Sequence, residues 1–198
     1  MRKPLQIAII LAVLALVALG FGGGCASTSL PPRLTDAQAK AVETTRFKAT
    51  VGVEPYQFPV YAEKLIRNLR ATGLFERVDA LAAFAEPPTF VARVDRAIYG
   101  TAAIPLWTGL SLGLIPTTVS EQHGHAFSLV PTARREQRIP IVFSYRGPST
   151  LGWWALVLNL TPDRTWRDVY SHPRFIQGLA WQLVAREREI SAYAKAGS

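Results

Sequence analysis

The alternation of hydrophobic and polar positions predicts a series of strands along the chain. The stretch FKATVGVEPY, residues 47–56, has the alternation and the β-branched content of a strand, and Pro55 would end it. Further strands are expected at LFERVDAL (74–81), TFVARVDRAIYG (89–100), EQHGHAFSLV (121–130) and QRIPIVFSYRG (137–147). The apolar run LGWWALVLNLTP (151–162) lacks alternation, which predicts a strand covered on both faces.

Two segments have the helical period instead. Residues 59–72 begin with Pro59, which suits a first helical turn, and Gly73 follows as a C-terminal cap. Pro173 opens a second apolar stripe that predicts one helix over 173–195. Together these elements predict an α/β fold of the α+β type, with a single mainly antiparallel sheet and two packing helices.

The N-terminus has the layout of a secretory signal peptide. Arg2 and Lys3 precede an uncharged stretch over residues 7–21, and three glycines lead to Cys25, which is the only cysteine in 198 residues. A single cysteine excludes an intramolecular disulfide framework and a four-cysteine zinc site. An ordinary signal peptide and an uncleaved membrane anchor are alternative interpretations.

With a cysteine directly after the small residues, this segment resembles a bacterial lipoprotein signal. Such signals usually carry leucine where this chain has Gly22. The resemblance implies cleavage after Gly24, acylation of Cys25 and, from Ala26 and Ser27, an outer-membrane location with the folded part facing the periplasm. The expected organisation is a signal peptide over 1–24, a lipid-anchored flexible linker over 25–45 and a single α/β domain over 46–198.

Charge narrows the choice of partners. The chain has a formal net charge of +8 and a pI near 10.1, and cleavage would remove two of the positive charges. In an envelope compartment the available anions are lipid headgroups, lipopolysaccharide phosphates and cell-wall carboxylates. We therefore expect membrane attachment and an envelope protein partner, and no nucleic acid.

Residues 97–120 contain no charged side chain. Pro105, Pro116 and several glycines make a membrane-spanning helix a poor interpretation. A loop or hairpin that packs on the core, a contact for a partner or the membrane, and a true span are the three alternatives.

One pattern points to a serine hydrolase. GLSLG, residues 109–113, matches the nucleophile elbow around Ser111, and Asp163 or Asp168 and then His172 follow in the order that α/β-hydrolases use. Pro116 stands where the helix after the elbow should form, which argues against an esterase. We therefore expect no catalysis.

A second pattern points to a metal. Glu121, His123 and His125 would project from one face of an extended strand. The two histidines could bind zinc or copper, with either Glu121 or His172 as a third ligand. The alternative places the histidines on the solvated face of an edge strand. No Walker or dinucleotide motif is present in the sequence, and no cofactor is expected.

The order strand, helix capped by Gly73, GLFERV and strand resembles the small α/β periplasmic domains of envelope lipoproteins. These include the curli-secretion type and the N-terminal domain of the Tol translocation protein. The resemblance implies a scaffolding or assembly role in the cell envelope. The competing functions are a small esterase that uses Ser111 and a subunit of an oligomeric envelope pore that inserts one hairpin.

Overall fold

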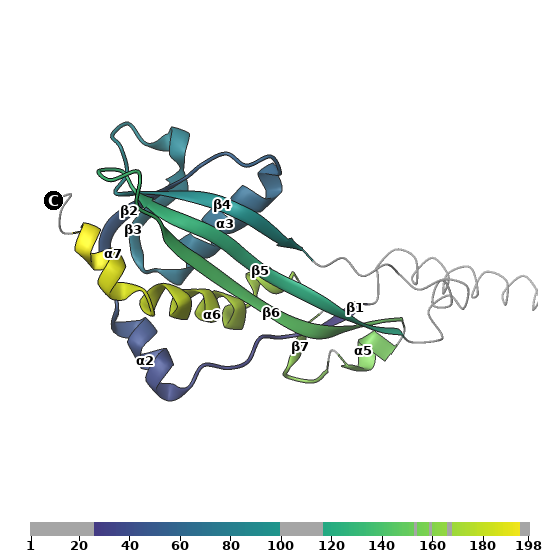
Figure 1. The fold of residues 1–198 in the computed structure, drawn as a ribbon. Helices are drawn as coiled ribbons and strands as arrows, with labels where there is room; N and C mark the ends of the chain where they lie inside the picture. Colours follow the sequence, from purple (N-terminus) through teal and green to yellow (C-terminus); the bar gives the residue numbers. More distant parts are fainter. Residues whose placement is uncertain (1–25, 100–116, 153, 159, 166–167, 195–198) are drawn as a thin grey trace, which may run out of the picture. The chain divides into compact units, whose positions relative to one another are not determined.

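The computed structural model describes residues 26–99, 117–152, 154–158, 160–165 and 168–194 (Figure 1). They form an α/β fold with a mixed seven-stranded sheet in the order β3-β2-β4-β5-β6-β1-β7. The chain divides into two compact units. Among the described residues, the main unit comprises those within 31–99, 122–146 and 168–194, and the small unit comprises those within 26–30, 117–121 and 147–165.

The strands of the main unit confirm the alternation in the sequence. They are β2 (Phe47–Val53), β3 (Phe75–Ala80) and β4 (Phe90–Tyr99), together with most of β5 (Thr117–Pro131) and β6 (Ile139–Leu151). Strand β2 pairs parallel with both β3 and β4, whereas β4 pairs antiparallel with β5. The expectation of a mainly antiparallel sheet is therefore wrong. A helix between β2 and β3 returns the chain to its starting edge, so that the next strand runs in the same direction.

That connecting helix is α3 (Pro59–Thr72), as expected. Gly73 caps it in the left-handed conformation with φ 65°, which glycine adopts without strain. The second expected helix is instead two helices, α6 (Pro173–Val184) and α7 (Glu187–Ala194). Between them the Arg186 N–H donates to the Leu183 carbonyl at 3.0 Å, a tighter turn that changes the chain direction. Ile190 of α7 is thereby fully buried.

The segment expected to be a flexible linker contains regular structure. Residues 26–29 form a strand, and α2 (Asp36–Thr44) forms a helix. A capping box explains α2: the Thr35 N–H donates to Gln38 Oε1 at 2.9 Å, and the Gln38 N–H donates to Thr35 Oγ1 at 3.3 Å. Helix α2 packs against α6. Two helices were expected to cover the sheet, and α2 and α7 add to them.

Helices α3 and α6 pack against each other over one face of the main unit's sheet. We call this the covered face and the opposite one the open face. Gly178 lets α6 approach closely, because a Cβ atom there would lie 2.5 Å from the Phe143 ring. The fully buried side chains between helices and sheet are Leu65, Leu69, Phe90, Phe127, Leu129, Phe175, Leu179 and Leu183.

The small unit holds β1 (Ala26–Ser29), β7 (Arg164–Thr165) and the short helix α5 (Trp154–Leu158). The strand expected over 151–162 is wrong. Gly152 adopts φ 106° after the end of β6, and the Ala155 N–H then donates to the Gly152 carbonyl at 2.9 Å, which starts α5. In the part of the chain that the structure describes, no helix is both long enough and apolar enough to cross a membrane.

Candidate functional site

His125 lies at the centre of a buried cluster under the covered face. It is fully buried, and Asn68 Nδ2 lies 2.9 Å from its Nε2 atom. Three rings surround it with centroids within 6 Å, those of Tyr61, Tyr170 and Phe175. The amide N–H donates, so Nε2 accepts and the ring proton sits on Nδ1. Helix α3 supplies two of these neighbours, because Tyr61 and Asn68 lie two turns apart on its buried side.

The two tyrosine hydroxyls hold β4 to β5 beside His125. The Tyr61 hydroxyl donates to the Gly124 carbonyl at 2.8 Å and accepts from the Ile98 N–H at 3.4 Å. The Tyr170 hydroxyl donates to the Ile98 carbonyl at 3.0 Å and accepts from the Gly124 N–H at 3.4 Å. Ile98 and Gly124 are partners in the register of these strands. Burial raises the pKa of Tyr61 above 10.0, so the hydroxyl keeps its proton at neutral pH. Both hydroxyls therefore bridge β4 and β5 at one register pair.

The electrostatic environment keeps His125 neutral. Burial, and to a smaller extent the positive charge of Lys64, lower the pKa of His125 from 6.5 to about 3, whereas Asp168 acts in the opposite direction. Lys64 Nζ lies 3.5 Å from Asp168 Oδ2 and 4.6 Å from the centre of the Tyr170 ring. A fully buried, neutral imidazole has no contact with solvent, so it is suited to packing rather than to proton transfer with a substrate.

Both interpretations of the Glu121, His123 and His125 pattern need correction. The histidines do not lie on the solvated face of an edge strand, because β5 lies between β4 and β6 and His125 faces the helices. His123 stacks near Tyr145, and Glu121 Oε2 accepts from Ser149 Oγ at 2.6 Å. Within the described residues, no three His, Cys, Asp or Glu side chains gather in a group that could hold a metal.

Asp168 and His172, two members of the alternative hydrolase triad, cap turns or helices with their side chains, and Asp163 makes a backbone contact. Asp168 caps a 3-10 turn, η2 (Val169–Ser171). Its Oδ2 atom forms an ion pair with Arg67 Nη2 at 3.2 Å. His172 caps α6, where its Nδ1 accepts from the Arg174 N–H at 3.2 Å. Burial and Arg174 lower its pKa. The Asp163 carbonyl accepts from the Leu30 N–H at 2.9 Å, whereas Ser111 lies outside the described residues.

The predicted lipid-attachment residue Cys25 and cleavage residue Gly24 also lie outside the described part of the chain. The same holds for residues 100–116 of the uncharged segment 97–120. Its described ends belong to β4 and β5, which are antiparallel neighbours in the sheet. The lipid-attachment, pore and partner-contact predictions for these residues remain predictions.

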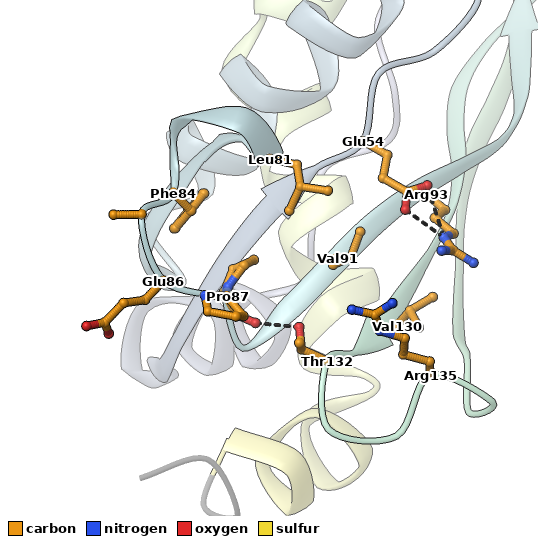
Figure 2. Close-up of a pocket in the computed structure, with 12 residues that line it drawn as sticks. Glu54, Leu81, Phe84, Glu86, Pro87, Val91, Arg93, Val130, Thr132 and Arg135 are labelled. Atoms are coloured by element: carbon orange, nitrogen blue, oxygen red, sulfur yellow. Dashed lines mark hydrogen bonds and ion pairs between the residues drawn. The ribbon is translucent and has the colours of Figure 1, made fainter.

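A pocket of about 320 Å³ opens on the open face of the main unit (Figure 2). Val91 and Val130 are register partners and form its floor. They lie on the open face because they alternate with Ala92 and Leu129, which are buried toward the helices. The 3-10 helix η1 (Leu81–Ala83) and the following prolines form one wall, so the pocket is lined mainly by apolar side chains.

Charged side chains stand around this apolar floor. Arg93 Nε lies 3.0 Å from a carboxylate oxygen of Glu54, and both side chains are partly exposed. Arg135 and Glu86 are exposed on the rim, where Figure 2 shows Arg135 across the pocket from Glu86. Ligand-binding pockets usually combine an apolar interior with a few polar groups that point into it.

The far wall of the pocket is fixed by the β5–β6 connection. Thr132 Oγ1 donates to the Pro88 carbonyl, and the Thr132 N–H donates to the Thr89 carbonyl at 3.0 Å. A second hollow of about 430 Å³ shares Pro87, Pro88 and Thr132 with the first and extends to Tyr193 of α7. The sequence analysis did not predict this pocket; the one local sign of it is Arg93, a charged residue in a strand whose other face is apolar.

The chain was compared with protein-family models, with curated proteins and with solved structures, and none of the three comparisons gives a match.

Proposed function

We propose that this protein is a bacterial envelope lipoprotein that binds a partner protein as a scaffold or assembly component, without catalysis of its own. It is attached to the periplasmic side of the outer membrane through acylated Cys25. The observation that carries the binding role is the pocket on the open face, in which Val91 and Val130 form an apolar floor beside the Glu54–Arg93 ion pair.

This chemistry suits a short segment of another protein. The apolar floor removes a partner's hydrophobic side chain from water, which contributes about 25 cal/mol per Å² of buried apolar surface. The Glu54–Arg93 pair and Arg135 offer both an acceptor and donors at the rim. A pocket with this mixture selects an apolar side chain flanked by polar backbone groups.

The lipid attachment is tested by intact mass and by incorporation of radiolabelled palmitate, in wild type and in Cys25→Ala. Acyl mass and label on an N-terminus at Cys25, absent from the variant, support the proposal. An unmodified full-length chain in the membrane fraction contradicts it.

The binding role is tested by photo-cross-linking in the cells that make the protein. Benzoylphenylalanine replaces Arg135 on the pocket rim or, as a matched control, Arg146, which is an exposed arginine of β6 outside the pocket. We expect an adduct with an envelope protein from position 135 only, and its loss when Val91→Trp fills the pocket. The same adducts from both positions, or none from position 135, contradict a role for the pocket.

A further inference from the structure

The small unit contains the strand that directly follows the predicted lipid-attachment residue. Strand β1 begins at Ala26, which pairs with Leu151 of β6, and its other edge pairs with β7. Ser27 is fully buried. Consecutive Cα atoms are 3.8 Å apart, so an acyl group on Cys25 lies within one residue of an interior strand of the sheet.

Side-chain contacts also fix β1 within the small unit. Ser149 Oγ donates to Thr28 Oγ1 at 3.0 Å, and Arg164 Nη1 donates to the Ser27 carbonyl at 3.3 Å and to Thr150 Oγ1 at 3.0 Å. No flexible linker would therefore separate a lipid on Cys25 from the folded small unit. The start of β1 must lie at the level of the lipid headgroups.

Helix α5 packs against β1, and the chain at its C-terminal end exposes two large apolar side chains. Leu160 is 85% exposed and Val157 is 54% exposed. Figure 1 shows α5 beside β1 and β7. The Leu160 N–H donates to the Val157 carbonyl at 3.1 Å, so the two residues belong to one hydrogen-bonded turn. We call Val157 and Leu160 the apolar turn.

We propose that the apolar turn inserts into the phospholipid bilayer beside the acyl anchor and serves as a second membrane contact. The inference rests on the proposed acylation of Cys25, which brings the bilayer to Ala26 and so to the helix that packs on β1. An exposed leucine is unremarkable on a surface that faces water. Next to a lipid anchor, the same side chain can leave water for the hydrocarbon of the bilayer. Two membrane contacts also fix the orientation of the small unit, which a single lipid anchor does not.

The test uses the acylated full chain in vesicles of phosphatidylethanolamine and phosphatidylglycerol. Acylation blocks the thiol of Cys25, so that Leu160→Cys supplies one free thiol for an environment-sensitive NBD fluorophore. Val142→Cys is the matched control, because Val142 of β6 is 51% exposed and belongs to the main unit. Intact mass is measured first and establishes whether Cys25 carries the acyl groups.

We expect NBD at position 160 to shift its emission to the blue on reconstitution. It should be quenched several-fold more strongly by doxyl-labelled lipid than NBD at position 142, with the opposite order for iodide in the water. Acylated protein in which position 160 is quenched by iodide as strongly as position 142 overturns the membrane contact and leaves the lipoprotein proposal standing. A chain that carries no acyl group on Cys25 overturns both.

Discussion

Replacing His125 with phenylalanine is expected to remove much of the protein's sensitivity to acid. The pKa of His125 falls from 6.5 to about 3 on folding, first because burial disfavours the imidazolium and then because Lys64 repels it. His125 therefore binds a proton below about pH 6.5 in the unfolded chain, whereas in the folded chain it stays neutral down to about pH 3. The contribution of His125 to stability is fully present above pH 6.5 and is lost as the pH falls from 6.5 toward 3.

The size of this effect follows from linkage. One proton of difference changes the free energy of unfolding by about 1.4 kcal/mol per pH unit. Between pH 7 and pH 4.5 His125 accounts for a loss of about 2 to 3 kcal/mol. The charged groups that face it, Lys64 and Asp168, are unchanged in the variant and affect both proteins alike.

The variant has a separate cost that does not depend on pH. His125→Phe leaves Asn68 Nδ2 buried without its partner, which costs about 1 to 3 kcal/mol. The double variant Asn68→Leu/His125→Phe removes both polar groups and is expected to recover part of this loss. Both variants should show the same weakened pH dependence.

The assay is urea unfolding of the purified full-length chain in detergent at pH 7 and at pH 4.5. His172→Asn is the control, because His172 also has a lowered pKa but is only partly buried, and asparagine keeps the helix cap. The wild type should lose more stability between the two pH values than His125→Phe does. An equal loss in both proteins would refute the buried, neutral histidine.

Three further predictions concern packing, capping and the pocket. Gly178→Ala should destabilise the fold by about 1 to 3 kcal/mol in urea unfolding, because the added methyl overlaps the Phe143 ring; Phe143→Leu in the same chain should recover part of this loss. Thr35→Ala should cost about 1 kcal/mol and reduce helicity by circular dichroism, and an unchanged stability would contradict the capping box. Arg93→Gln should change the free energy of unfolding by less than about 1 kcal/mol, because the ion pair of Arg93 with Glu54 is partly exposed. The same variant should reduce the yield of the cross-link from position 135 on the pocket rim.

Sequence reasoning succeeded where the signal is local. Pro59 and Gly73 mark both ends of α3, and the alternation over residues 47–53 defines β2. Each of these signals depends on the backbone preferences of one residue or on a period within one element. The pattern therefore placed the strands and helix α3 of the main unit, although it missed α2 and could not tell a parallel neighbour from an antiparallel one.

Sequence reasoning failed where the pattern within a segment fits two structures. The run 151–162 has no period, so its hydrophobicity fits a buried strand or a helix equally well, and Gly152 decided between them. The stripe over 173–195 did not show the turn after Val184, because the charged residues 186–189 fit the exposed side of one helix as well as a turn between two helices. Periodicity describes a face of an element and does not describe what covers that face.

The candidate sites show the same limit. Placing His123 and His125 on one face of a strand was sound, but whether that face meets water depended on the helices that cover it, because Tyr61 of α3 and Phe175 of α6 pack on His125. The pocket brings together residues near 54, 81–93 and 130–135, and no window of sequence contains them all. Its one local sign was Arg93 in a strand whose other face is apolar.

The segment after Cys25 bears most directly on how the protein would work at a membrane. Small, polar and proline-bearing residues usually indicate a tether, and a tethered domain samples every position that the linker length allows. Here Ala26–Ser29 pairs on both edges, with β6 and with β7. A lipid on Cys25 would therefore hold the small unit at a fixed height and keep α5 at the bilayer surface. Such an attachment would hold a contact made by the small unit itself at a constant distance from the lipid, which a flexible tether does not do.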